Sequence, residues 1–186
     1  MPVPAQRRRT GDLHDRQVVT VRAASPEDFD AWFALFTSVA AEGRWLGAEA
    51  PLDRAARREA FERDLAAADA ASSLAEVEGQ LAGVLGLRLR RGVAGLGMLV
   101  AEAWRGRGVG SSLMEAALAW AAGEHAHKVF LEVWPHNAAA VALYRKYGFV
   151  EEGRLHRHYR RRNGELWDAL QMGLVLDRDS PGSPYG

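Results

Sequence analysis

A glycine-rich segment that joins an apolar strand pattern to a helix pattern constrains the fold more than any other part of the chain. Residues 96–100 are apolar, residues 111–121 (SSLMEAALAWA) have helical periodicity, and residues 105–110 between them hold three glycines and two arginines. Glycine allows tight turns and the close approach of a ligand. A helix N-terminus adds unpaired N–H groups and the positive end of the helix dipole. The junction therefore predicts a strand–turn–helix unit that binds a phosphate or diphosphate.

Two well-known phosphate-binding patterns do not fit this junction. The P-loop pattern requires a lysine after its last glycine, and none follows Gly110. The dinucleotide pattern G-x-G-x-x-G also fails, because Gly106, Gly108 and Gly110 are spaced by twos. What remains is R-x-x-G-x-G, formed by Arg105, Gly108 and Gly110. This segment resembles the coenzyme-diphosphate turn of the GNAT N-acetyltransferases.

Composition excludes several other classes of protein. The 186 residues include 24 basic and 24 acidic side chains, so the formal net charge of zero predicts no nucleic-acid partner. The absence of cysteine excludes disulfides, thiolate nucleophiles and thiolate metal sites. No apolar run is long enough for a membrane span, and the N-terminus lacks a signal-peptide pattern, so we expect no membrane partner and a cytoplasmic location.

The periodicity of the chain predicts alternating helices and strands between two tails. Residues 1–16 and 177–186 have the composition of flexible tails, and residues 17–176 form the expected domain. The predicted strands are 18–22, 73–77, 81–90, 93–100, 128–133, 153–159 and 166–175, and the predicted helices begin at residues 25, 52, 108 and 137. This order resembles the GNAT acyl-CoA N-acyltransferase fold, an α/β class with a mixed, mostly antiparallel central sheet and helices on both faces.

A second block strengthens the resemblance. Residues 131–149 (LEVWPHNAAAVALYRKYGF) contain an Asn followed seven residues later by a Tyr, and then a Gly-Phe ending, as in the family. The resemblance implies that Tyr144 is the acid that protonates the departing thiolate, and that Asn137 holds the coenzyme's pantetheine arm or a water. A phenol stays protonated at neutral pH, which suits an acid. The alternative is that Tyr144 is a core aromatic beside Leu143 and Tyr147.

The resemblance also implies which backbone groups bind acetyl-CoA, the expected cosubstrate. The family leaves N–H groups unpaired on the strand before the glycine turn, and the matching positions are Met98 for the acetyl oxygen and Val100 for the pantetheine arm. The expected coenzyme-binding set is Met98, Val100, Arg105, Gly106, Arg107, Gly108, Val109, Gly110, Ser111, Asn137 and Tyr144. Each arginine could instead be a solvated surface charge.

Glu132 is the candidate general base. It is an acid within the otherwise apolar segment 129–133, and a charge buried there is costly unless it has a role. A glutamate at this position resembles the base of acetyltransferases that modify peptide N-termini. The alternatives are a Glu paired with an arginine and one that faces solvent at a strand edge. The family's other common base position holds Val93 and Ala94, which leaves the identity of the base open.

The acceptor pocket is expected between the first helix, the loop after it and the last hairpin. Aromatic residues in these segments favour an apolar or aromatic amine, and the candidates are Trp32, Phe36, Trp45, Trp134 and Tyr159. His156 and His158 share a strand face, but without cysteines or paired carboxylates nearby we expect no metal site.

The function expected from this resemblance is acetyl-CoA-dependent transfer of an acetyl group to the primary amine of a small molecule, such as an amino acid. Transfer is expected to be direct, in a ternary complex, since no cysteine can carry the acetyl group. One alternative is N-terminal acetylation of a peptide or protein, and another is a non-catalytic acyl-CoA-binding sensor. The acceptor, the oligomeric state (including a homodimer) and any ligand of the arginine-rich residues 154–162 stay open.

Overall fold

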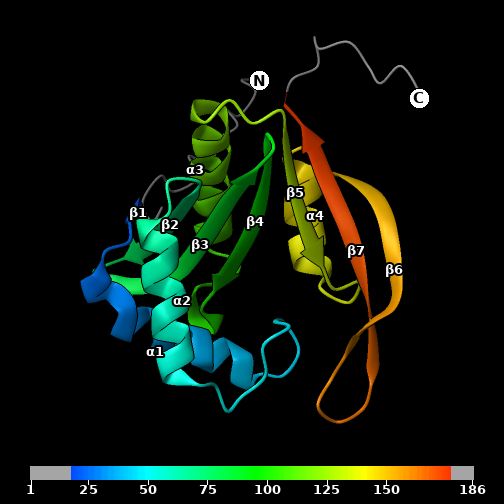
Figure 1. Ribbon diagram of the computed structural model, residues 1–186, viewed down its shortest axis with the longest axis horizontal. Coiled ribbons are helices and arrows are strands. Elements are labelled where there is room, and N and C mark those ends of the chain that lie inside the picture. The colour runs from blue at the N-terminus through cyan, green and yellow to red at the C-terminus, as the bar shows by residue number, and fades with distance from the viewer. Residues whose placement is uncertain (1–17, 177–186) are drawn as a thin grey trace, which may run out of the picture.

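The computed structural model describes residues 18–176, so the predicted tails, residues 1–16 and 177–186, lie outside the described residues. Seven strands and four α-helices make up the fold (Figure 1). The strands are β1 (Val19–Ala23), β2 (Ala70–Val77), β3 (Gln80–Arg90), β4 (Val93–Val100), β5 (Lys128–Val133), β6 (Val150–Arg160) and β7 (Leu166–Val175). The helices are α1 (Phe29–Ala41), α2 (Arg54–Ala66), α3 (Val109–Gly123) and α4 (Ala138–Lys146), with short 3-10 turns η1 (Pro26–Asp28) and η2 (Glu102–Trp104).

The strands form one sheet in the order β1-β2-β3-β4-β5-β7-β6. Every neighbouring pair is antiparallel except β4 and β5, which are parallel. The predicted mixed, mostly antiparallel sheet is therefore confirmed. The parallel pair is joined by the crossover helix α3, which returns the chain from the end of β4 to the start of β5.

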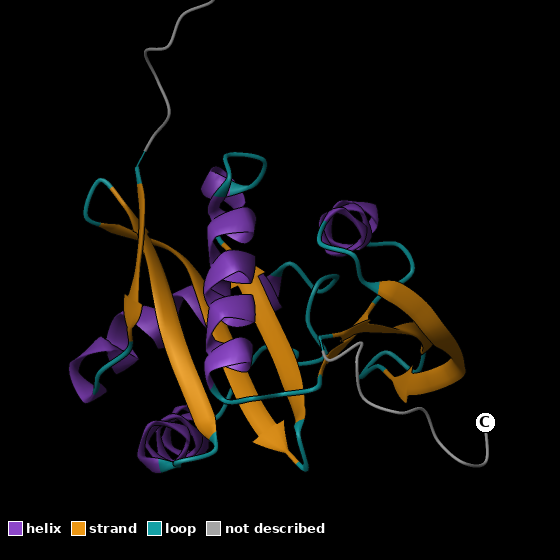
Figure 2. Cartoon of the chain, turned by 90° about the horizontal axis from the view of Figure 1, so that it is seen from above, coloured by secondary structure: helices purple, strands orange, loops and turns teal. Residues whose placement is uncertain are grey.

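Helices cover both faces of the sheet, as predicted (Figures 1 and 2). On one face, Leu35 and Val39 of α1 pack against Val84 and Leu99 of the sheet. On the other face, apolar residues of α3 and α4 pack against the alternate residues of the strands. This alternation follows from the period of two in a strand, which sends successive side chains to opposite faces. None of the described helices is long and apolar enough to cross a membrane.

Most predicted boundaries agree with the structure to within a few residues, but the second helix is shorter than predicted. The sequence predicts a helix over residues 52–70, whereas α2 ends at Ala66 and β2 begins at Ala70. Residues 70–72 pair with residues 86–88 of β3, and the Leu89 N–H donates to the Asp69 carbonyl at 2.7 Å. Pairing with a neighbouring strand therefore overrides the helix propensity of the alanine-rich segment.

Candidate functional site

The parallel strands β4 and β5 separate partway along their length, and the candidate site lies in this opening. They are paired only over Val93–Gly95 and Lys128–Phe130. Beyond Gly95, β4 continues to Val100 beside β3, whereas β5 continues to Val133 beside β7. One edge of β4 therefore has no strand partner over residues 96–100.

The register of β4 determines which backbone groups face this opening. The Ala101 N–H donates to the Ala82 carbonyl at 2.9 Å, and β3 and β4 pair without a bulge. In an antiparallel pair, alternate residues direct their N–H and C=O groups toward the partner strand and away from it. Because Ala101 points toward β3, Met98 and Val100 point away from it, into the opening. The two backbone positions expected to contact the thioester and the pantetheine arm thus lie on the unpaired edge.

The glycine turn connects this edge to the N-terminus of α3. Gly106 and Gly108 have φ of 73° and 91°, left-handed values that favour glycine. The Ser112 N–H donates to the Gly108 carbonyl at 3.1 Å as the first bond of the helix. The N–H groups of Val109, Gly110 and Ser111 precede that bond, and the N-cap Gly108 has no side chain to accept from them. They form a site suited to an anion.

Gly110 has a second reason to be glycine. A Cβ atom built on Gly110 would lie 3.0 Å from Cδ2 of Leu143 on α4, which is too close without a shift of that side chain. This glycine therefore lets α3 and α4 approach each other beside the anion site.

The two arginines of the turn have different surroundings. Both terminal nitrogens of Arg105 contact the Glu42 carboxylate, at 2.8 and 2.5 Å, and Nε donates to the Val100 carbonyl at 3.1 Å. This bidentate contact lowers the pKa of Glu42. The Arg105 side chain thus ties the turn to the end of α1 instead of facing an anion. Arg107 is exposed and lies 5.3 Å from the centre of the Trp104 ring, which leaves its guanidinium accessible to a phosphate.

Asn137 and Tyr144 lie on α4 and line the same cavity as Met98. Asn137 caps the helix, since its Oδ1 accepts from the Ala140 N–H at 3.2 Å. The Tyr144 ring is buried among core residues, with its centre 5.9 Å from that of Phe149. Burial raises the pKa of Tyr144 to about 12. The side chain therefore packs in the core and also reaches the cavity with a protonated phenol.

The expectation that Glu132 is a buried acid is wrong. The side chain is exposed, because it lies on the face of β5 opposite to Val129, Leu131 and Val133, which pack against α3 and α4. It accepts a short hydrogen bond from the Tyr159 hydroxyl and a longer one, 3.4 Å, from Gln171 Nε2. The bond to Glu132 is the main cause that raises the pKa of Tyr159 to about 12. Glu132 does line the cavity, with no arginine partner among residues 18–176.

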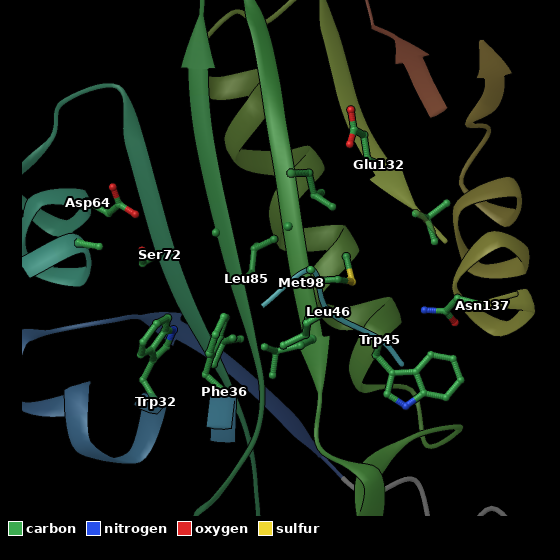
Figure 3. Close-up of a pocket in the computed structure, with 18 of the residues that line it drawn as sticks. Trp32, Phe36, Trp45, Leu46, Asp64, Ser72, Leu85, Met98, Glu132 and Asn137 are labelled. Atoms are coloured by element: carbon green, nitrogen blue, oxygen red, sulfur yellow. The ribbon is translucent and has the colours of Figure 1, made fainter. Parts of the chain in front are cut away.

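All five aromatic residues predicted for the acceptor pocket line one cavity of about 420 Å³. In Figure 3, Trp32 and Phe36 lie on one side of Met98, and Glu132 and Asn137 lie on the other. The rings of Trp32 and Phe36 are stacked at 5.0 Å, and the Trp134 ring meets Tyr159 edge-on at 4.9 Å. Sequence reasoning missed the contribution of α2, whose residues Arg57, Ala60, Phe61 and Asp64 also line the cavity. Their spacing of three, one and three residues places them on one face of a helix, and this pattern could have identified them from the sequence.

The loop between α1 and α2, which contributes Trp45 to the cavity, is attached to the β6–β7 hairpin by Arg161. This arginine is 4% exposed, and it donates to the carbonyls of Leu46, Gly47 and Gly43 at 2.8, 3.3 and 3.4 Å. Its guanidinium also lies 4.3 Å from the centre of the Trp167 ring. Arg162 continues the attachment with a bond of 2.8 Å to the Ala50 carbonyl.

The arginine-rich residues 154–162 are therefore largely engaged within the fold. Arg154 pairs with Asp168 at 2.8 Å, while Arg161 and Arg162 hold the α1–α2 loop. Within the described part of the chain, no group of histidine and acidic residues has the arrangement of a metal site.

Comparison with known proteins identifies the family of this chain. Residues 30–149 match the sequence profile of the Acetyltransferase (GNAT) family. The chain belongs to the GNAT family. The family assignment agrees with the resemblance found in the glycine turn and in residues 131–149.

Two proteins that are similar to this chain have names that state different activities. The L-amino acid N-acetyltransferase AaaT of Escherichia coli is 38% identical over 90 residues, which cover 46% of this chain and 53% of AaaT. An N-alpha-acetyltransferase of Sulfurisphaera tokodaii is 33% identical over 122 residues, which cover 58% of this chain and 71% of that protein. The chain thus spans about half of the length of AaaT.

A solved GNAT structure shows the same fold over nearly the whole described chain. The ribosomal-protein-alanine N-acetyltransferase of Brucella melitensis superposes with a TM-score of 0.77 and 26% identity, covering 84% of this chain and 99% of that one.

Proposed function

We propose that this GNAT protein transfers the acetyl group of acetyl-CoA to the primary amine of a small molecule such as an amino acid. The observation that carries the proposal is the unpaired edge of β4. Its outward-facing backbone groups at Met98 and Val100 run from the acceptor cavity to the glycine turn at α3. A thioester whose diphosphate lies at that helix N-terminus would extend along this edge into the cavity.

Each chemical requirement of acetyl transfer has a candidate group in the cavity. The Met98 N–H is a fixed dipole that can stabilise the negative charge developing on the thioester oxygen. Glu132 accepts a proton from the incoming ammonium, directly or through a water, and frees the lone pair that attacks the carbonyl carbon. As the C–N bond forms and the C–S bond breaks, Tyr144 donates its proton to the departing sulfur. The nitrogen loses a second proton as the amide forms, and this proton restores the Tyr144 phenol. The first proton stays on Glu132 until it is released to solvent, so charge and protons balance.

Of the two alternative functions, one has specific support and the other does not explain the residues of the cavity. The likeness to the Sulfurisphaera N-alpha-acetyltransferase supports acetylation of a peptide or protein N-terminus. A non-catalytic acyl-CoA sensor would need the anion turn but neither the Tyr144 hydroxyl nor Glu132 in the cavity, and both are present.

The release of free thiol from acetyl-CoA, measured across free amino acids, short peptides and simple amines, tests the proposal. We expect release with small amines, and mass spectrometry of the product should show acetylation on nitrogen. Release with peptides alone would favour the N-terminal acetyltransferase. Tight coenzyme binding without thiol release with any amine would favour the sensor.

A further inference from the structure

One face of α2 supplies the cavity with its only described basic side chain. Arg57, Ala60, Phe61 and Asp64 follow the helical spacing that places residues on one face, and all four line the cavity. Arg57 is half-buried, and its guanidinium lies 4.8 Å from the centre of the Phe36 ring. Because Phe36 is also a cavity residue, this contact holds the guanidinium at the aromatic end of the cavity.

Arg57 differs from its neighbours on α2 in having no carboxylate partner. Arg54 and Arg58 both contact Asp30, at 2.7 and 3.0 Å. Asp64, the acidic residue on the cavity face of α2, contacts Arg88 at 2.5 Å. No ion pair or hydrogen bond engages the Arg57 guanidinium within residues 18–176; the cation–π contact with Phe36 is its described interaction.

A half-buried guanidinium without a counter-ion in an aromatic cavity is unfavourable until an anion pairs with it. Arginine binds a planar carboxylate through two parallel N–H···O bonds, and stacking on a ring leaves its N–H edge free for this contact. Glu132 is the cavity's acidic group near the unpaired edge of β4. The other acid of the described lining, Asp64, is paired with Arg88, so Glu132 and Arg57 are the charged lining residues without an ion-pair partner, and Arg57 is the one available to a substrate carboxylate.

We propose that Arg57 binds the carboxylate of a free α-amino acid and so restricts the acceptor to amines that carry one. This inference rests on the proposed acetyl transfer and specifies its substrate class. The aromatic lining by Trp32, Phe36 and Phe61 favours an amino acid with an apolar side chain. A peptide has an amide in place of the first residue's carboxylate, so it forms no ion pair with Arg57.

Pairs of substrates that differ only in the carboxylate test this inference. We compare L-phenylalanine with L-phenylalaninamide as acceptors for the wild-type protein and for Arg57→Gln, Arg57→Lys and Arg58→Gln. The wild type should favour the free acid in kcat/KM by about 10- to 100-fold. Arg57→Gln should remove most of that preference by lowering kcat/KM for the acid alone, and Arg57→Lys should retain part of it. Arg58→Gln, one residue along and outside the cavity, should behave as the wild type.

Two results would overturn the role of Arg57. One is equal use of the acid and the amide by the wild type. The other is an equal loss of kcat/KM for both acceptors in Arg57→Gln, or a raised KM for acetyl-CoA. Either result would assign Arg57 a role in folding or in coenzyme binding.

Calorimetric binding of L-phenylalanine and its amide to the CoA-bound protein separates this inference from the proposed acetyl transfer. Preferential binding of the acid that depends on Arg57, without turnover, would refute acetyl transfer but retain the carboxylate site. Equal binding without turnover would refute both.

Discussion

The hydrogen bond from the Tyr159 hydroxyl to Glu132 couples the candidate base to the acceptor cavity. This hydrogen bond, with smaller contributions from burial and from the negative charge of the carboxylate, raises the pKa of Tyr159 to about 12. Glu132→Gln removes this charge, so the pKa of Tyr159 should fall toward its ordinary value of about 10. Phenolate absorbance during an alkaline titration measures the shift, with Tyr159→Phe identifying the signal.

The same variant tests the role of Glu132 in the reaction. Loss of the proton acceptor should lower kcat by about 100-fold with little change in coenzyme affinity. Glu115→Gln, which changes the glutamate bonded to Tyr147 outside the cavity, is the matched control and should leave Tyr159 and kcat unaffected. An unchanged kcat in Glu132→Gln would show that the base is another group.

Tyr144 packs in the core, and we also propose that its hydroxyl is the acid of the reaction. One substitution can separate these two roles. Tyr144→Phe keeps the ring that packs near Phe149 and removes only the hydroxyl. We expect kcat to fall by about 100-fold or more while the Kd of acetyl-CoA stays within about twofold, because the role proposed for the phenol is to protonate the leaving sulfur. Tyr147→Phe, at the C-cap of α4, removes a hydroxyl that donates to Glu115 and to the Ser111 carbonyl outside the cavity, and it serves as the control. If Tyr144→Phe retained the full kcat, the Tyr144 hydroxyl would have no role in catalysis and the residue would serve only as a core aromatic.

At the scale of elements, alanine substitutions at two glycines with similar φ angles can distinguish backbone strain from a loss of coenzyme binding. Gly108 caps α3 with φ of 91°, and Gly164 lies in the β6–β7 turn with φ of 89°, and a Cβ would meet open space at both. Alanine at either position should destabilise the fold by about 1 kcal/mol, as measured by urea unfolding. Only Gly108→Ala should also weaken acetyl-CoA binding, by about tenfold, because it disturbs the N–H groups that we propose bind the diphosphate. Equal coenzyme affinity in both variants would exclude the turn as the anion site.

The attachment of the α1–α2 loop to the hairpin depends on a buried charge. Arg161→Ala leaves the carbonyls of Gly43, Leu46 and Gly47 without their donor and opens a void beside Trp167. We expect a loss of about 3 kcal/mol in the free energy of unfolding. Arg160→Ala, at an exposed neighbouring position, should change it by less than about 0.5 kcal/mol. Similar free energies of unfolding for the two variants would show that Arg161 does not attach the α1–α2 loop to the hairpin.

Local patterns in the sequence were sufficient to predict most elements. The runs at 93–100, 128–133 and 166–175 gave the bounds of β4, β5 and β7, because alternation and apolar runs reflect burial on a sheet. The end of α2 could not be predicted from local propensity, since the pairing of residues 70–72 with β3 decides it.

The candidate site was predictable where it depends on short motifs. The glycine turn, Asn137 and Tyr144 have fixed spacings, and the structure brings them to one opening of the sheet. The pairing of Arg105 with Glu42 joins residues 63 positions apart, and the exposure of Glu132 depends on which face of β5 the helices α3 and α4 cover. No local pattern records such contacts, which is also why the attachment made by Arg161 was missed.

At the scale of the whole molecule, one cavity receives both the β4 edge and the aromatic acceptor pocket, so donor and acceptor should be present together. Such an arrangement predicts that the acetyl group passes directly from acetyl-CoA to the amine, without an acetylated form of the protein. Initial rates of thiol release, measured while acetyl-CoA and an amino acid are both varied, test it most directly. Direct transfer predicts intersecting double-reciprocal lines and an N-acetylated product. Parallel lines, or the absence of thiol release by a protein that binds acetyl-CoA, would contradict it.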